Sequence, residues 1–381
     1  MPTSIQRHRA RERILALTGL VALGLIAVGL SAIGNLRARG IHAGLGFFWN
    51  TAGFDIGFAL IPYDATKSYA RAFVVGLLNT LFVSALASSL ALIIGLSLAI
   101  ARLSASRLLR AGAGTLTEII RNTPLLLQLF AWYFLVFGAL PPVRQSLSMG
   151  GWAILNNRGV FVPGPQLSAT SLILMIGAAT ALGAVALSRA IGVVPSSSRW
   201  PALKMMGFGA AIAIWAVGLF GADWEVPRIR GFNVVGGVNI PPELSALVTA
   251  LAIYAGAFAA EAFRSAFLAV PESQWESARA LGLRPFLVLR LVVLPQALRI
   301  ALPPLGNHTI NVFKASSLAA AVGFPDLMQV FAKTTLNQTG QAVEVISITL
   351  VVYLLISFSI SYLVRHLEKG PELSWLPKPS H

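Results

Sequence analysis

Long apolar runs constrain the fold of this chain more than any other feature of its sequence. A hydrocarbon core about 30 Å thick is crossed by roughly 20 apolar residues in a helix. About eight runs approach that length, near residues 15–34, 73–101, 116–138, 169–188, 205–222, 243–270, 301–323 and 343–364. With 56% hydrophobic and 11% charged residues, the composition is too apolar for an ordinary soluble domain. The sequence therefore predicts an all-α integral membrane protein with about eight transmembrane helices.

The basic residues between the runs indicate the orientation, because Lys and Arg accumulate on the cytoplasmic side of a membrane. The tail at 1–14 carries four arginines, and the tail at 367–381 carries Lys369 and Lys378. Alternate loops are also more basic than the loops between them. We therefore predict that both termini are cytoplasmic, which requires an even number of spans, and that residues 35–72 form a periplasmic segment.

The first run, 15–34, could be an uncleaved membrane anchor or the apolar part of a signal peptide, since arginines precede it. Ile14 to Ile33 is longer than the 7–15 apolar residues expected of a signal peptide, and no A-x-A cleavage site follows. These features favour the anchor.

The remaining composition excludes several classes of function. A formal net charge of +15 favours contact with anionic membrane lipid, whereas binding of nucleic acid needs basic residues gathered on one polar face, which this chain lacks. The absence of cysteine excludes thiolate catalysis and Cys-ligated metal sites. No lysine sits in a phosphate-cradling G-x-x-x-x-G-K-[ST] loop, and the histidines are scattered. We predict no catalytic residue, no metal and no cofactor in this chain, so that it is not an enzyme.

The stretch 271–300 is strongly patterned and cytoplasmic by the charge argument. Pro271 suits a first helical turn, and Glu272 and Glu276 lie towards the end where a helix dipole favours carboxylates. Gly282 offers a terminator in the left-handed conformation. The pattern predicts a helix of about three turns below the bilayer.

A second helix is predicted to start at Pro285 and to be interrupted at Leu294-Pro295, before the next apolar run. Such a helix-turn-helix fits two roles equally well. It could insert into a groove on another protein, or it could lie on anionic lipid through its arginines.

The spacing within this stretch resembles the "EAA" loop of ABC importer permeases, E-A-A-x3-G-x9-I-x-L-P. The matching residues are Glu276, Ser277, Ala278, Gly282, Val292, Leu294 and Pro295. Ser277 replaces Ala and Val292 replaces Ile, and both changes are conservative in size. The resemblance implies that the loop docks a separate ATPase subunit, with Glu276, Ala278 and Gly282 at the contact.

Flanking segments are similar to polar amino acid permeases and to general L-amino acid permeases. They are 121–128, 151–159, 254–264 and 314–318. The resemblance implies a type I ABC importer transmembrane domain at 73–366, with an insertion at 139–241 that adds two helices and a docking loop at 271–295. It implies a multi-pass protein of the bacterial inner membrane that carries L-amino acids of broad or polar and acidic type. The implied partners are two copies of a cytoplasmic ATPase that bind ATP-Mg, a homologous second permease forming a heterodimer, and a periplasmic amino-acid-binding protein.

Polar residues at membrane depth usually face protein or water, because exposing an ionised group to lipid is costly. Five polar residues of the seventh run are candidates for the translocation path or gate: Asn307, Asn311, Lys314, Ser316 and Ser317. They could instead hydrogen-bond between helices and only stabilise the bundle. Glu261 and Arg264 are three residues apart on one helix face and could pair with each other or with the partner subunit; we predict the pair within the chain. Arg121 is interpreted as an interfacial anchor.

Two other classes of function remain as alternatives. An ion-gradient-driven transporter or channel of another fold would be expected to show inverted repeats with paired broken helices, and none is evident in the sequence. A membrane scaffold without a substrate would leave the polar face of the seventh run unexplained.

Overall fold

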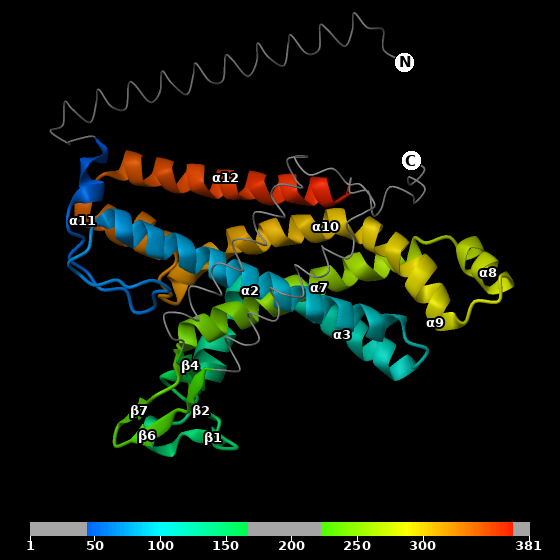
Figure 1. Cartoon of the computed structure of the whole chain (residues 1–381), viewed down its shortest axis with the longest axis horizontal. Coiled ribbons are helices and arrows are strands. Elements are labelled where there is room, and N and C mark those ends of the chain that lie inside the picture. The colour runs from blue at the N-terminus through cyan, green and yellow to red at the C-terminus, as the bar shows by residue number, and fades with distance from the viewer. Residues whose placement is uncertain (1–43, 167–221, 369–381) are drawn as a thin grey trace, which may run out of the picture. The chain divides into compact units, whose positions relative to one another are not determined.

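A computed structural model describes residues 44–166 and 222–368 (Figure 1). The chain forms two compact units, one made of described residues 44–79 and 325–354 and the other of 80–166, 222–324 and 355–368. The boundaries fall inside two long helices, α2 (Tyr69–Leu103) and α12 (Ala342–Glu368).

Four described helical segments are long and apolar enough to cross a membrane: Tyr69–Leu103, Pro242–Leu268, Pro285–Ala321 and Ala342–His366. A fifth candidate is the pair Arg107–Asn122 and Leu125–Phe137, which is bent by 103°. These segments correspond to the predicted runs 73–101, 243–270, 301–323, 343–364 and 116–138. The predicted runs 15–34 and 169–188, and nearly all of 205–222, lie outside the described residues.

In the larger unit, α7 (Pro242–Leu268) is the central helix. In its most apolar stretch of 18 residues, 72% is buried, whereas the corresponding share for α12 is 11%. Helix α7 packs against α2, α4 (Leu125–Phe130) and α10 (Leu294–Ala315). Small residues allow the close approach of α2 and α7: a Cβ on Gly95 would lie 2.6 Å from the Ala259 Cβ atom. Such contacts are typical of helices packed within membranes.

The bent pair consists of α3 (Arg107–Asn122) followed, after Pro124, by α4 and the π-helical η2 (Ala131–Phe137). Thr123 precedes this proline and is extended, because the proline ring disfavours a helical conformation in the residue before it. The bend therefore has a local cause in the sequence.

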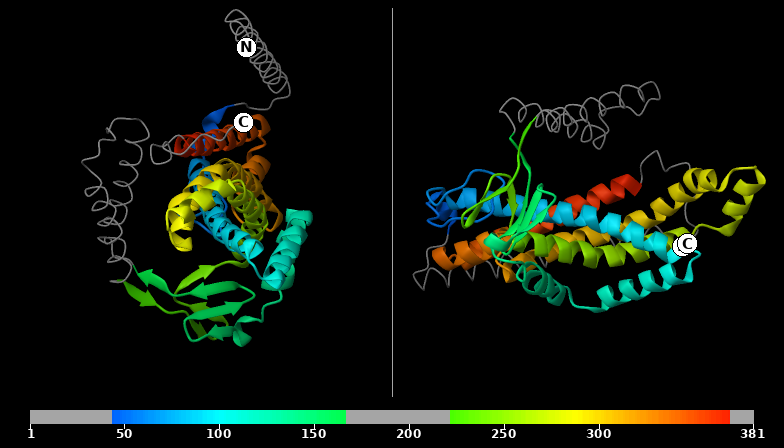
Figure 2. Two further views of the ribbon diagram at one scale, coloured as in Figure 1. Left: turned by 90° about the vertical axis from the view of Figure 1, so that its right-hand side faces the viewer. Right: turned by 90° about the horizontal axis from the view of Figure 1, so that it is seen from below.

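The described part of the predicted insertion, between η2 and α7, contains eight short strands, and their region is drawn in Figures 1 and 2. After the single turn η3 (Val143–Gln145), these are β1 (Leu147–Met149), β2 (Ala153–Asn156), β3 (Gly159–Val162), β4 (Gly164–Gln166), β5 (Asp223–Glu225), β6 (Arg228–Arg230), β7 (Asn233–Val235) and β8 (Val238–Ile240). An antiparallel sheet has the order β1-β2-β3-β8, and β4-β5 and β6-β7 form two further pairs.

This insertion corrects the prediction of an all-α chain. Its strands bury a small core of Val143, Ile154, Phe161 and Val234. Each strand has only three or four residues, too short for its alternation of buried and exposed side chains to stand out from turn sequence. Positive φ angles at Gly150 and Gly151 form the turn between β1 and β2.

The predicted helix-turn-helix follows α7. Its first helix is α8 (Glu272–Ala280), and Gly282 ends it with φ of +75°, as expected. The second helix starts at Pro285 with α9 (Pro285–Val288) but does not stop at Pro295. The π-helical η4 (Leu289–Val293) leads directly into α10, so the predicted interruption at Leu294-Pro295 is wrong. Pro295 directly follows this π-helical turn, and local π-helical adjustment is one way in which a membrane helix accommodates the missing N–H of a proline.

The smaller unit has an aromatic core. The 3₁₀ helix η1 (Leu45–Trp49) places Phe47 against Tyr69 of α2 and Phe331 of the π-helical η6 (Met328–Thr335). The helix α11 (Leu336–Thr339) follows η6 and ends at Gly340, with φ of +68°. Asn79 of α2 donates two 2.8 Å hydrogen bonds, to the Phe58 and Pro325 carbonyl oxygens.

Candidate functional site

The hairpin of α8 and α9 has a buried side and an exposed side. Ala278 is 3% exposed and packs with Val270, Val288 and Val293, whereas Glu276 and Ser277 are exposed. The methyl group of Ala278 therefore fills the interior of the hairpin, and its predicted contact with a partner stays a prediction. Its small size lets α8 lie close to the second helix.

The other predicted docking residues lie around this core. Gly282 is exposed, and a Cβ added there would meet nothing within 4 Å. Leu294 and Pro295 are half-buried where α10 begins. The exposed surface of the hairpin therefore includes Glu276, Ser277 and Gly282 of the predicted set.

Glu261 of α7 is the centre of an ion cluster. Its carboxylate lies 2.6 Å from Arg102 Nη1 of α2, 3.1 Å from Arg264 Nη1 and 3.9 Å from Arg121 Nη1 of α3. Arg121 is also 3.6 Å from Glu118. Glu261 therefore joins three helices within two turns of the end of α7 that leads to α8.

The sequence predicted only the pair of Glu261 and Arg264. Arg121 is more than an interfacial anchor, because its guanidinium carbon also lies 5.1 Å from the centre of the Phe258 ring. Arg102 is 159 positions from Glu261, so no local spacing could reveal their contact. In the sequence, the only signal for Arg102 was its position directly after the apolar run 73–101.

The polar residues of α10 form an exposed stripe. Asn307, Asn311 and Lys314 are all exposed and follow the spacing of one helix face. Leu305, Val312 and Phe313 are buried on the other side. An exposed lysine at membrane depth needs water or protein around it, so this stripe is the candidate path surface.

The two predicted serines lie differently. Ser316 is 0% exposed, and its hydroxyl donates to the Phe313 carbonyl oxygen at 2.7 Å. Ser317 is half-buried and donates to the Lys314 carbonyl oxygen at 2.8 Å. Both hydroxyls satisfy the backbone where α10 passes into the 3₁₀ helix η5 (Ser316–Ala321), and the structure does not bring Ser316 to the exposed stripe.

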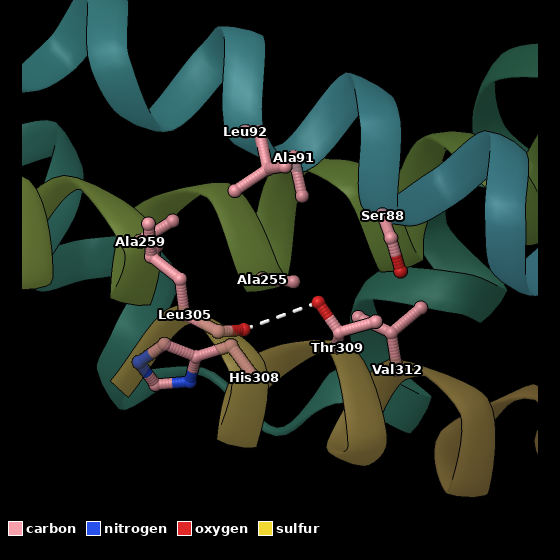
Figure 3. A pocket seen from close by; sticks show the side chains of 9 residues that line it. All are labelled: Ser88, Ala91, Leu92, Ala255, Ala259, Leu305, His308, Thr309 and Val312. Carbon is pink, nitrogen blue, oxygen red and sulfur yellow. Dashed lines mark hydrogen bonds between the residues drawn. The ribbon is translucent and has the colours of Figure 1, made fainter. Parts of the chain in front are cut away.

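A small cavity lies between α2, α7 and α10 (Figure 3). Ser88 of α2, Ala255 of α7 and Thr309 of α10 are among the residues that line it. Its volume of about 10 Å³ holds about one water molecule, far less than the several hundred Å³ of a pocket for a small ligand. This cavity is too small for an amino acid. Within the described ranges, no cluster of side chains is arranged to hold a metal ion.

Comparisons with known proteins agree with the resemblance in the sequence. Residues 234–372 match the family model "Binding-protein-dependent transport system inner membrane component". The putative amino-acid ABC transporter permease protein YhdX of Escherichia coli K12 is 44% identical, over 87% of this chain and 86% of its own length. The general L-amino acid transport system permease protein AapQ of Rhizobium johnstonii is 39% identical, over 85% and 82%.

The glutamate/glutamine/aspartate/asparagine transport system permease protein BztB of Rhodobacter capsulatus is 33% identical, over 94% of this chain and 92% of its own length. All three matches cover most of both chains. Taken with the apolar helices, they show that this multi-pass membrane protein belongs to the amino-acid ABC transporter permeases.

Proposed function

We propose that the chain is one of two permease subunits of an importer that moves L-amino acids, of broad or polar and acidic type, across the bacterial inner membrane. A separate ATPase, present in two copies, drives the movement and binds ATP-Mg. A homologous permease completes the pathway as a heterodimer, and a periplasmic binding protein delivers the substrate. Both termini are cytoplasmic in an arrangement of eight spans with the type I importer fold.

The observation that carries this proposal is the exposed hairpin at the end of α7. Glu276 and Ser277 face outward on a short helix held by a core of its own, as a surface for a groove on another protein would be. Near that end of α7, Glu261 forms ion pairs with Arg102 of α2, Arg121 of α3 and Arg264 of α7 itself. A displacement of α8 would therefore move α2 and α3 together with α7.

The stripe of Asn307, Asn311 and Lys314 is proposed to line the path between the two permeases. Its amide and ammonium groups can hydrogen-bond a substrate carboxylate as it passes. A cation that attracts the carboxylate also explains why an ionisable side chain is retained on an exposed face at membrane depth.

The test is co-purification of the ATPase subunit with the tagged permease, together with uptake by the complete transporter. Glu276→Lys should reduce both ATPase retention and uptake at least tenfold, while the permease still inserts into the membrane. Glu272→Lys makes the same charge change one turn earlier on α8 and should have a smaller effect. Wild-type uptake and ATPase retention in Glu276→Lys would refute docking through α8.

A further inference from the structure

The β-stranded insertion presents a set of arginines and one aromatic ring that no part of the proposed function uses. We define the arginine face as Arg144, Arg158, Arg228, Arg230 and Phe232. We propose that the arginine face is the docking surface for the amino-acid-binding protein, through an acidic patch on that partner. This inference rests on the proposed function, because only an importer of this kind needs such a partner.

The register of the β6-β7 hairpin separates its two faces. Ile229 pairs with Val234, which is buried in the core of the insertion. Arg228 pairs with Val235 and Arg230 pairs with Asn233, and cross-strand partners point to the same side of a sheet. Both arginines therefore project from the face opposite the core, and both are exposed.

The other members are held against the same hairpin. The Arg144 guanidinium carbon lies 3.8 Å from the centre of the Phe232 ring, which is itself 69% exposed. Arg158 Nη1 approaches Asn233 Oδ1 at 3.5 Å, on the side that carries Arg230. A guanidinium stacked on a ring is already ordered, so it loses less conformational freedom when a partner binds.

The charge of the insertion calls for an acidic partner. Residues 139–166 contain two arginines and no Asp or Glu. Asp223 and Glu225 are the acidic residues of 222–240, and Glu225 accepts a hydrogen bond from Gln166 at 3.1 Å. Among the residues that the structure describes, none of the four arginines of the face forms an ion pair with a carboxylate.

The composition favours a protein over a lipid surface. Protein interfaces are enriched in Arg and aromatic residues and depleted of Lys. The described insertion has four arginines and no lysine, although lysine binds phosphate headgroups as readily. The stranded structure of the insertion also differs from the amphipathic helices that lie on membranes.

The position of the insertion suits this partner. Strand β8 ends at Ile240 and α7 begins at Pro242, whereas α8 follows the other end of α7. A 27-residue helix is about 40 Å long and exceeds the hydrocarbon core. The insertion and the proposed ATPase contact therefore lie on opposite sides of the membrane, as a binding protein and an ATPase must.

The assembled importer in proteoliposomes provides the test, with ATP hydrolysis measured against the concentration of the purified binding protein of the same system. Arg228→Gln/Arg230→Gln should raise the half-maximal concentration about tenfold and weaken its dependence on salt, while the maximal rate stays the same. The control Arg107→Gln/Arg110→Gln removes equal charge from α3 and should not change the half-maximal concentration.

An unchanged half-maximal concentration in Arg228→Gln/Arg230→Gln would overturn the proposal. If this variant loses activity only when the vesicles contain anionic lipid, the arginine face binds the membrane instead, and the proposal is overturned too. If the wild-type importer shows no stimulation by the binding protein at all, the proposed function itself fails, and the inference fails with it.

A cross-linking experiment does not depend on the arginine variants. The chain has no cysteine, so a single introduced thiol can carry a photoreactive group at one site. Val235→Cys places the thiol on the same side of the hairpin as Arg228, its cross-strand partner, and Ile229→Cys places it on the opposite side. The natural side chains of Val235 and Ile229 are 46% and 42% exposed. Only Val235→Cys should capture the binding protein. Equal capture from both sites, or capture within the chain itself, would refute docking on this face.

Discussion

Replacing Glu261 by Gln tests whether one carboxylate holds three helices together. The change keeps the size of the side chain and removes its charge. It leaves Arg102, Arg121 and Arg264 without the carboxylate that lies 2.6, 3.9 and 3.1 Å from them. The three guanidinium groups would then repel each other across α2, α3 and α7, with Glu118 as the remaining acidic neighbour of Arg121.

The size of the effect follows from how far the cluster is buried. Removing one partner of a fully buried ion pair costs about 3–5 kcal/mol, and an exposed pair contributes about 0–1 kcal/mol. The Arg102 side chain is 13% exposed and that of Glu261 is 32% exposed, between those limits. We expect Glu261→Gln to lower the free energy of unfolding by about 2 kcal/mol. At about 2–4 °C per kcal/mol, the unfolding temperature should fall by roughly 5 °C.

The assay is thermal unfolding of the purified protein in detergent, with all variants heated at one rate because membrane proteins often unfold irreversibly. Glu118→Gln is the matched control: its carboxylate lies 3.6 Å from Arg121, but its side chain is 57% exposed. The control should unfold within about 1 °C of the wild type. If Glu261→Gln unfolds together with Glu118→Gln, the cluster does not hold the helices and the reasoning is wrong.

Two further predictions concern the exposed stripe of α10 and the smaller unit. Lys314→Met should slow uptake about tenfold, the loss of one charged hydrogen bond, without changing the unfolding temperature. Lys333→Met on η6 is the control, and normal uptake in Lys314→Met would contradict a role in the path. Asp326, in the turn after η5 and outside the membrane-spanning segments, is 0% exposed, and burial raises its pKa from 3.8 to about 7. The folded state binds the proton of Asp326 more tightly than the unfolded state does. Protonated Asp326 should therefore stabilise the fold fully below about pH 4, and this contribution, on the order of 4 kcal/mol, should be lost as the pH rises through 7. Asp326→Asn should flatten this part of the profile of unfolding temperature against pH, and an unchanged profile would disprove the burial argument.

The helices and the hairpin could be predicted because their signals are local. An apolar run of 20 or more residues has few conformations other than a helix, and Pro271, Gly282 and Pro285 mark the turns of the hairpin in the sequence itself. Pro295 misled the prediction because a proline inside a helical pattern usually ends or kinks the helix. Here the π-helical η4 directly precedes it and the helix continues into α10, a local adjustment that the sequence does not signal.

The insertion and the ion cluster could not be predicted because their contacts are distant in the sequence. Val160 of β3 pairs with Ile240 and Gly164 of β4 pairs with Glu225, so these two strands find partners across a long intervening segment. A strand of three residues gives no periodic signal of its own. In the same way, the charge of Arg102 suggested only a cytoplasmic loop until α2 and α7 were seen to pack together.

The two proposed contact surfaces are attached to the two ends of α7, and this arrangement separates the expected effects of their variants. The central helix is packed against α2, α4 and α10, and close-packed interiors transmit displacement because they deform little. Glu261 lies near the α8 end, whereas the arginine face lies beyond the other end, so a loss of the ion cluster leaves the outer surface intact. Glu261→Gln should therefore lower the maximal rate of coupled ATP hydrolysis at an unchanged half-maximal concentration of the binding protein. The arginine variants should show the opposite pattern, a raised half-maximal concentration at an unchanged maximal rate. A variant of either kind that altered both quantities equally would show that α7 does not separate the two surfaces as its length implies.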